Sequence, residues 1–293
     1  MRAGDRDDRG APALNAPPPT PPAPPPCGAG APARSLVAVG GSPLEVAIWT
    51  AEPRPAGDLQ TGEGALVMLH EGLGSVDLWR EFPQLLARAS GRSVIAFSRH
   101  GHGRSGPPPR ARTPSFFAEE ALEVLPALLG ALGVRRPVLV GHSDGASIAL
   151  IHAAHHPVGA VAALAPHVFV EELTLAAIRQ ARERYLRGEL RQRLARHHDD
   201  VDAAFFGWCD VWLDPAFAHW SIEREVELIR APMLLVQGTE DPYGTLEQLA
   251  RIERRARAPV ARLVLPGGHS PHREHAAMLA QRIASFIEDA GGP

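Results

Sequence analysis

The feature that most constrains this chain is a Gly-His-Ser-Asp-Gly turn, residues 141–145, which joins an apolar run to an apolar, helix-compatible segment. Residues 138–142 are rich in Val and Leu, as in a buried strand. Strand, sharp turn and helix are the setting that a nucleophile elbow requires, with Ser143 at the apex. Gly141 and Gly145 suit a turn that brings two backbones together and leaves no room for Cβ atoms. We therefore expect Ser143 to be a catalytic nucleophile.

Short apolar runs alternate with helical patterns along most of the chain. The expected strands cover residues 35–39, 44–49, 65–70, 93–98, 137–142, 159–165, 232–237 and 260–265. The expected helices cover residues 77–89, 116–132, 144–155, 245–256 and 271–288. The first two strands flank a Gly-Gly-Ser-Pro turn and should pair as a hairpin. The alternation that follows predicts an α/β fold, a mostly parallel central sheet with helices on both faces.

The alternation stops between His167 and Arg230, in a strand-poor segment rich in Arg and Glu with helical patterns at residues 171–187 and 222–229. We interpret residues 167–230 as an inserted helical cap and residues 35–166 and 231–293 as the α/β core. Residues 1–34 are charged and then rich in Pro and Ala. Such a composition cannot bury a core, so we expect a disordered tail there.

Bulk properties favour small-molecule chemistry. A formal net charge of -3 over 293 residues provides no basic surface for nucleic acid. The sequence contains neither an apolar run of about 18 residues, as a membrane span needs, nor a secretory signal. Cys27 and Cys209 lie in dissimilar surroundings and suggest no disulfide framework. We expect a cytoplasmic monomer or homodimer that acts on a small-molecule substrate without a cofactor or a membrane or nucleic-acid partner.

A serine hydroxyl needs a histidine to accept its proton and an acid to orient that histidine. On a parallel sheet of this kind the order is Ser, then Asp, then His, each following a strand. Asp241 follows the strand at residues 232–237 and is the candidate acid, with Glu240 as the reserve. His269 follows the last strand, in a Gly-Gly-His loop. The carboxyl ends of parallel strands meet at one edge, so we expect a Ser143-His269-Asp241 triad.

Attack on a carbonyl also requires N–H groups that meet the developing oxyanion. One should be the backbone N–H of Asp144, directly after the nucleophile. The other should come from the His-Glu-Gly-Leu-Gly loop after an earlier strand, with Gly72 as the first choice and Glu71 as the second.

Four further residues are candidates for the substrate pocket. Trp208 and Trp212 belong to an aromatic stretch of the expected cap, His167 ends a strand where the cap begins, and His70 opens the oxyanion loop. Histidines also recur at positions 269, 272 and 275, but they do not form a His-Glu-x-x-His pattern, and we expect no metal.

From about residue 35 onward the chain resembles the serine hydrolases of the α/β-hydrolase superfamily that carry a helical cap. The resemblance rests on the His-Glu-Gly-Leu-Gly loop at residues 70–74, on Ser-Arg-His-Gly-His-Gly-Arg-Ser at residues 98–105, on the elbow at Ser143, and on Asp241 and His269. It implies the α/β-hydrolase fold. Many relatives have His-Gly where this chain has His70-Glu71, which brings a carboxylate to the oxyanion loop. Relatives that act as dehalogenases or epoxide hydrolases have aspartate at the elbow, unlike this chain.

The expected function is hydrolysis of small carboxylic esters through an acyl-enzyme. The same triad also serves lactonases and hydrolases of C–C bonds in ring-cleavage products, and these remain alternatives. A non-catalytic, receptor-like ligand-binding role is the alternative from another class.

Overall fold

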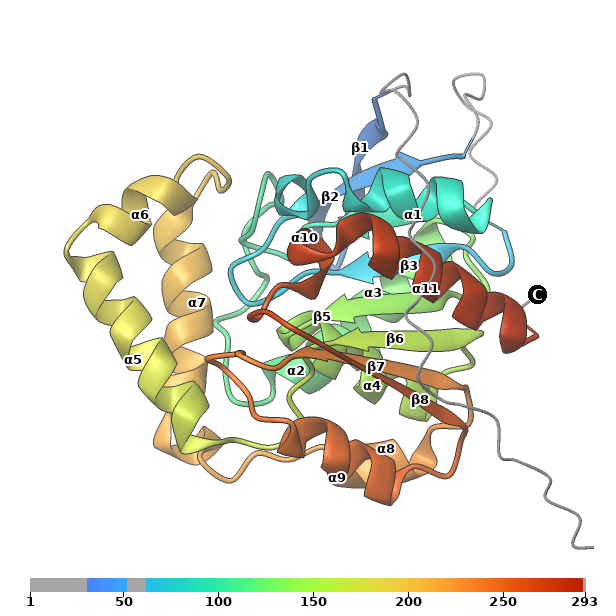
Figure 1. Ribbon diagram of the computed structural model, residues 1–293. Coiled ribbons are helices and arrows are strands. Elements are labelled where there is room, and N and C mark those ends of the chain that lie inside the picture. The colour runs from blue at the N-terminus through green and yellow to red at the C-terminus, as the bar shows by residue number, and fades with distance from the viewer. Residues whose placement is uncertain (1–30, 52–61, 292–293) are drawn as a thin grey trace, which may run out of the picture.

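A computed structural model describes residues 31–51 and 62–291 of the chain. Within these ranges eight strands form one sheet in the order β1-β2-β4-β3-β5-β6-β7-β8 (Figure 1). The strands are β1 (Ala33–Val39), β2 (Ser42–Trp49), β3 (Leu66–Leu69), β4 (Val94–Phe97), β5 (Val138–His142), β6 (Ala160–Leu164), β7 (Met233–Gly238) and β8 (Val260–Leu265). β1 and β2 form the expected hairpin, β2 also pairs antiparallel with β4, and the remaining pairs are parallel. The predicted α/β fold class is confirmed.

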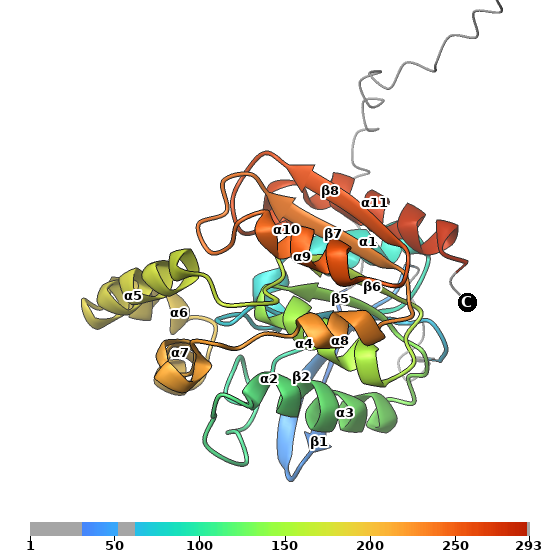
Figure 2. The ribbon, with the colours of Figure 1, turned by 90° about the horizontal axis from the view of Figure 1, so that it is seen from below.

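Helices cover both faces of the sheet (Figure 2). One face carries α1 (Phe82–Ser90) and α11 (Ala276–Asp289), which pack on each other. The other face carries α2 (Phe116–Glu119), α3 (Leu125–Ala131), α4 (Asp144–His155), α8 (Glu223–Leu228) and α9 (Glu247–Arg255). Alternate residues of β3 divide between the two cores: Leu66 and Met68 pack under α1 and α11, while Val67 and Leu69 pack on the opposite side. The candidate nucleophile thus lies on a rigid support buried on both faces.

Three expected helices are interrupted, each for a local reason. The helix expected at residues 77–89 is a 3₁₀ turn, η1 (Val76–Trp79), followed by α1, because Arg80 has a φ of 53° and Pro83 opens the next helix. A π-helical turn, η2 (Glu120–Val124), separates α2 from α3 just before Pro126, which has no N–H to donate. The C-terminal helix breaks at His275 into α10 (Pro271–Glu274) and α11.

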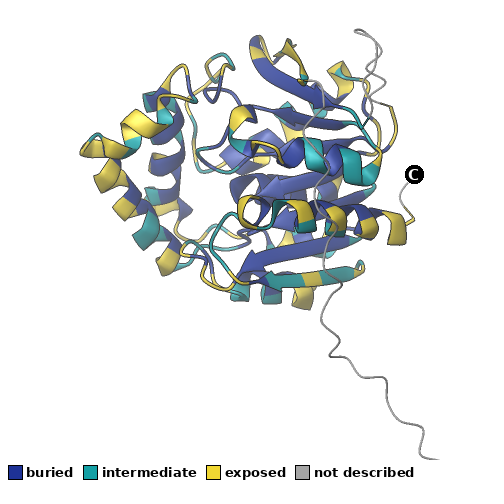
Figure 3. Ribbon diagram, turned by 45° about the horizontal axis from the view of Figure 1, so that its top comes forward, coloured by how far each residue is buried: buried dark blue, intermediate teal, exposed yellow. Residues whose placement is uncertain are grey.

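Between β6 and β7 the chain leaves the sheet and forms α5 (Glu172–Leu186), α6 (Glu189–Leu194), α7 (Val201–Leu213) and η3 (Pro215–Phe217). The sequence pattern predicted α5 but neither α6 nor α7. Figure 3 shows that the inner helix α7 is largely buried, whereas the outer sides of α5 and α6 are exposed. The last helix of the expected cap, α8, instead packs against α4 and α9 of the core. We refer to residues 170–220 as the helical excursion.

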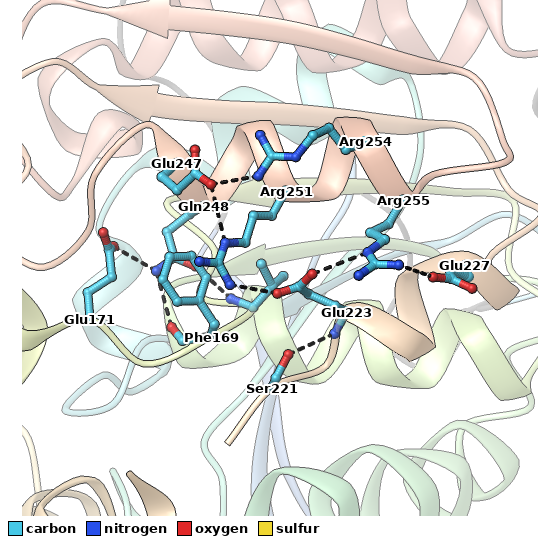
Figure 4. A network of polar contacts seen from close by, with 11 residues as sticks. Phe169, Glu171, Ser221, Glu223, Glu227, Glu247, Gln248, Arg251, Arg254 and Arg255 are labelled. Atoms are coloured by element: carbon cyan, nitrogen blue, oxygen red, sulfur yellow. Dashed lines mark hydrogen bonds and ion pairs between the residues drawn. The ribbon is translucent and has the colours of Figure 1, made fainter. Parts of the chain in front are cut away.

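The two ends of the excursion lie side by side. Phe169 and Ser221 form an antiparallel bridge, and the Ile222 N–H donates to the Val168 carbonyl at 2.9 Å. Figure 4 shows the polar contacts that fasten this base to α8 and α9. The guanidinium of Arg251 lies 3.6 Å from the centre of the Phe169 ring and pairs with Glu223 at 2.7 Å. The excursion is therefore anchored to the core at one narrow base.

Two further expectations concern the N-terminal tail and membrane-spanning segments. Of the expected tail, residues 1–30 lie outside the described residues, and Ala33 and Arg34 belong to β1. In the described ranges, no helix combines the length and the apolar character that crossing a bilayer demands.

Candidate active site

The turn after β5 holds Ser143 in a strained conformation, with φ 53° and ψ -119°. Its flanking glycines are required by close backbone contacts. A Cβ on Gly141 would overlap the carbonyl of Gly145, and a Cβ on Gly145 would overlap the carbonyl of Leu69. Side chains larger than hydrogen would push strand and helix apart, which agrees with the reason predicted for both glycines.

The three predicted triad residues come together at the carboxyl ends of their strands. The Ser143 Oγ atom lies 2.9 Å from His269 Nε2, and His269 Nδ1 lies 2.8 Å from each carboxylate oxygen of Asp241. Ser143 is 6% exposed, so its hydroxyl is close to the surface of the core yet shielded by its neighbours. The hydrogen bonds can move a proton from Oγ to the imidazole while the carboxylate holds the ring orientation.

The carboxylate of Asp241 is held by further donors. The Tyr243 N–H donates to Oδ1 at 2.8 Å, and the Gln237 amide donates to Oδ2 at 3.2 Å. Burial alone would raise the pKa of Asp241, but the hydrogen bonds from His269 and from the Tyr243 backbone hold that pKa below its ordinary value. Asp241 is therefore ionised and can stabilise a protonated His269. Glu240, the reserve candidate, is exposed.

The loop after β3 is fixed through four consecutive carbonyls. Arg99 donates to the carbonyls of His70 and Glu71 at 2.5 and 3.0 Å. His102 Nε2 lies 2.9 Å from the Gly72 carbonyl, and His198 Nε2 lies 3.1 Å from the Leu73 carbonyl. Each donor is almost fully buried, so the loop has little freedom to turn.

Unlike its carbonyls, two backbone N–H groups of this loop have no acceptor among the described residues. The backbone N–H groups of Glu71 and Gly72 donate to no residue in the described parts of the chain. Asp144 is the first residue of α4, where a helix has no internal acceptor for its N–H. The two predicted oxyanion donors, Gly72 and Asp144, are thus both available, and the loop after β3 lies beside the elbow because β3 and β5 are adjacent.

Two tryptophans one turn apart on α7 contact the two predicted oxyanion donors, one tryptophan at each. Trp208 lies against Gly72, where a Cβ would overlap its indole ring. Trp212 is 1% exposed and donates from Nε1 to Asp144 Oδ1 at 3.2 Å. Burial raises the pKa of Asp144 to about 6, partly offset by Arg99 and by this hydrogen bond. The predicted pocket residue Trp212 therefore supports the turn from behind, whereas Trp208 covers the oxyanion loop.

The two histidines predicted for the pocket differ in their surroundings. His70 is fully buried: its Nδ1 donates to the Glu71 carbonyl at 2.7 Å, and its Nε2 accepts from the Arg99 N–H at 3.0 Å. It belongs to the support of the loop. The ring of His167 lies 5.9 Å from that of His269, and burial lowers the pKa of His167 to about 3. His167 is therefore a neutral imidazole beside the triad.

Sequence reasoning assigned no role to Arg99, His102, His198 or His142. Arg99 and His102 lie in the loop at residues 98–105 that carries the family resemblance, so their position was marked although their contacts were not. His198 sits in the excursion, 125 residues away from the Leu73 carbonyl that it binds. Contacts over such separations leave no periodic pattern in the sequence.

The three regularly spaced histidines do not converge. His269 belongs to the triad geometry, His272 is buried between aromatic rings, and the His275 ring donates to the Pro266 carbonyl at 2.7 Å. In the described residues no group of three or more His, Cys, Asp or Glu side chains is arranged to hold a metal ion.

Comparisons with known proteins agree with this architecture. The chain is 26% identical to the serine hydrolase BPHL of Homo sapiens over 241 residues, which cover 78% of this chain and 81% of that protein. The enol-lactonase of Burkholderia xenovorans LB400 superimposes with a TM-score of 0.65 at 18% identity, covering 87% of this chain and 100% of that one. The CarC serine hydrolase involved in carbazole degradation gives a TM-score of 0.67 at 19% identity, covering 88% and 99%. The profile of the alpha/beta hydrolase family matches residues 66–282. The eight-stranded sheet, the elbow after β5 and this match establish that the chain belongs to the alpha/beta hydrolase family.

Proposed function

We propose that the protein is a serine hydrolase of small carboxylic esters that works through an acyl-enzyme. The observation that carries the proposal is the hydrogen-bonded series from Ser143 Oγ through His269 to the Asp241 carboxylate, next to two unpaired backbone N–H groups. A nucleophile, a base, an orienting acid and an oxyanion site within hydrogen-bond reach are what acyl transfer requires.

In the acylation half of the reaction, His269 Nε2 accepts the proton of Ser143 as Oγ forms a bond to the ester carbonyl carbon. The carbonyl oxygen becomes an oxyanion and accepts hydrogen bonds from the backbone N–H groups of Asp144 and Gly72. As the tetrahedral intermediate collapses, the C–O bond to the alcohol breaks and the alcohol oxygen takes the proton from His269. The acyl group remains on Ser143.

In the deacylation half, His269 takes a proton from water while the water oxygen attacks the acyl carbon. The same N–H groups hold the second oxyanion. Collapse breaks the bond to Oγ, which recovers the proton from His269, and the carboxylic acid leaves. Asp241 remains ionised throughout and stabilises the imidazolium.

The excursion at residues 170–220 serves in this proposal as the cap that limits the substrate. Its inner helix α7 reaches Gly72 and Asp144 through Trp208 and Trp212. Lactones are cyclic esters and undergo the same two steps, and similarity to a protein named as an enol-lactonase supports including them among the substrates to be tested.

Labelling with a fluorophosphonate, followed by a substrate panel, tests the proposal. We expect the wild-type protein to be labelled at Ser143 and Ser143→Ala to lose both labelling and hydrolysis of p-nitrophenyl esters. Ser90→Ala is the matched control, since Ser90 ends α1 and its hydroxyl donates to the Leu86 carbonyl of the same helix at 2.8 Å. Full turnover by Ser143→Ala would refute the proposal.

The panel should hold p-nitrophenyl esters of graded length, five- and six-membered lactones, and a dienone with a C–C bond open to hydrolysis. Faster turnover of the dienone than of any ester would replace ester hydrolysis by C–C bond hydrolysis on the same triad. A folded wild-type protein that neither reacts with the fluorophosphonate nor turns over any member of the panel would favour the receptor-like alternative.

A further inference from the structure

The carboxylate of Glu71 lies in the oxyanion loop yet turns toward a histidine behind the elbow. Its Oε2 atom lies 3.5 Å from His142 Nδ1, and its Oε1 atom lies 3.5 Å from a guanidinium nitrogen of Arg273. The side chain of Glu71 is 20% exposed and that of His142 only 1%. The nucleophile is thus preceded in sequence by a buried histidine that faces an acid.

The contact made by Nε2 of His142 shows which ring nitrogen carries a hydrogen. His142 Nε2 lies 2.7 Å from the main-chain carbonyl of His269. Because a carbonyl only accepts, Nε2 must carry a hydrogen. A neutral imidazole has a single N–H, so Nδ1 would then direct a lone pair at the Glu71 carboxylate. Among the described residues Nδ1 has no hydrogen-bond partner, so a second proton there would be held by Coulomb attraction to Glu71 Oε2 across 3.5 Å.

The groups that face His142 from the other elements do not supply a competing acid. His269 lies in the loop after β8 and His272 in α10, with ring centres 5.1 and 4.6 Å from that of His142. Burial lowers the pKa of His272 well below its ordinary value, so it is neutral. Trp79 approaches from η1 with its ring centre at 6.3 Å. The nearby cation Arg273 faces Glu71, not His142.

The charge of Glu71 is stabilised from two sides. Burial alone would raise the pKa of Glu71, but contact with His142 and the Arg273 guanidinium hold that pKa well below its usual range. An ionised carboxylate one residue before Gly72 would oppose the negative charge that develops on a bound oxyanion unless a cation compensates it.

We propose that Glu71 and a doubly protonated His142 form a charge pair that positions the catalytic histidine and neutralises the carboxylate beside the oxyanion site. In its catalytic part this inference rests on the proposed function. His142 acts through the carbonyl of His269 and does not touch the reacting atoms, so it is a positioning residue. Its loss should lower kcat more than it changes KM.

A set of isosteric substitutions tests the pair. Gln at position 142 can still donate to the His269 carbonyl but carries no charge, so H142Q leaves Glu71 compensated by Arg273 alone. We expect H142Q to lower kcat about ten-fold or more, with KM within about two-fold. E71Q removes the charge that opposes the oxyanion but also the acid that holds the second proton of His142. A neutral His142 donates less strongly to the His269 carbonyl, so we expect a smaller loss, about three-fold. The double variant E71Q/H142Q should recover to the level of E71Q.

Two control variants make the same chemical changes elsewhere. His152 is 2% exposed and donates to the Ala121 carbonyl at 2.8 Å on the far side of α4, so H152Q alters a buried histidine away from the site. E288Q alters an exposed carboxylate near the end of α11, a residue that has no part in the proposed site. Neither should reproduce the kcat loss of H142Q. If E71Q/H142Q were as slow as H142Q, or slower, the proposal that His142 compensates the charge of Glu71 would be wrong.

Nuclear magnetic resonance of protein with labelled histidine provides a readout that needs no activity. We expect both ring nitrogens of His142 to be protonated in the wild-type protein at pH 7 and only Nε2 in E71Q. A neutral Nε2–H tautomer in the wild-type protein would overturn the inference. If Ser143 failed to react with a fluorophosphonate while His142 was doubly protonated, the proposed function would fail and the charge pair would stand.

Discussion

Trp208 occupies the space that a side chain at Gly72 would need. A Cβ built on Gly72 would overlap the indole ring and lie 2.9 Å from its Cε2 atom. One turn further along α7, Trp212 donates to the Asp144 carboxylate. The inner helix of the excursion therefore contacts both residues that we propose as oxyanion donors. The position of the excursion and the shape of the proposed oxyanion site are coupled through these two tryptophans.

The first prediction concerns this close approach. Gly72→Ala should displace Trp208 or shift the loop, and because small misplacements of catalytic groups can cost about a hundred-fold, we expect kcat/KM to fall between about ten- and a hundred-fold. Ester hydrolysis measures the effect. Gly62→Ala is the control, since a Cβ there meets nothing within 4 Å. Gly72→Ala/Trp208→Ala should regain part of the activity lost by the first substitution; no recovery would mean that Trp208 is not what the added methyl group meets.

The second prediction concerns Asp144, whose pKa burial raises from 3.8 to about 6. Between these values the folded chain binds more protons than the unfolded chain, so this group's contribution to stability falls as pH rises from about 4 to 6. The ionised form then costs about 3 kcal/mol above pH 6, at 1.36 kcal/mol per pH unit.

Asp144→Asn removes that cost and can still accept from Trp212. We expect the variant to be more stable than the wild-type protein by about 1 to 3 kcal/mol at pH 8 and by little at pH 4.5. Urea unfolding at the two pH values measures the difference. Asp210→Asn, an exposed position on α7, should show no such dependence. A difference that is the same at both pH values would contradict the buried, ionised carboxylate.

Part of this architecture could be read from the sequence because it depends on local patterns. Apolar runs marked all eight strands to within two residues, and their order placed Ser143, Asp241 and His269 at one edge. The interruptions within the expected helices were not predicted, because the positive φ of Arg80 has no sequence signature and Pro126 is compatible with a helix start. α7 was missed because Ala203, Phe206 and Leu213, which are only partly buried, add apolar side chains outside its buried face and hide the helical period of that face.

The support of the oxyanion loop could not be predicted for a different reason. Arg99 and His198 hold this loop by donating to main-chain carbonyls, which every residue possesses, so the partner's identity leaves no trace in the sequence. The resemblance to a known family marked Glu71 as unusual. Its contact with His142 depends on the pairing of β3 with β5, which the sequence pattern does not specify.

The third prediction concerns His198, which joins the excursion to the core. Its Nδ1 accepts from the Gly103 N–H at 3.0 Å, and its Nε2–H donates to the Leu73 carbonyl. Burial lowers the pKa of His198, so just below pH 6.5 the unfolded chain binds a proton at this residue more readily than the folded chain does. The stabilisation is present above about pH 6.5 and is lost as pH falls below that value. Buried His70, His102 and His272 act in the same direction.

We therefore expect the free energy of unfolding to fall steeply between pH 7 and 5, by up to about 1.4 kcal/mol per pH unit for each such histidine. His198→Gln should make this slope shallower by at most the contribution of one proton, measured by urea unfolding across the range. His219→Gln, at an exposed position, is the control and should leave the slope unchanged. Equal slopes for His198→Gln and the wild-type protein would contradict a neutral, buried His198.

The last prediction concerns Asp241, the proposed acid of the triad. Asp241 accepts hydrogen bonds from the Tyr243 N–H and from Gln237 as well as facing His269 Nδ1 at 2.8 Å from both oxygens. In Asp241→Asn the amide can donate to His269 and favour the wrong tautomer, so we expect kcat to fall about a thousand- to ten-thousand-fold. Because Asn fits the same space, the midpoint of thermal unfolding should change by only a few degrees. Glu240→Gln next to it should retain wild-type turnover. If instead Glu240→Gln were the slower variant, the orienting acid would be Glu240, and the loop after β7 would have to rearrange to bring it to His269.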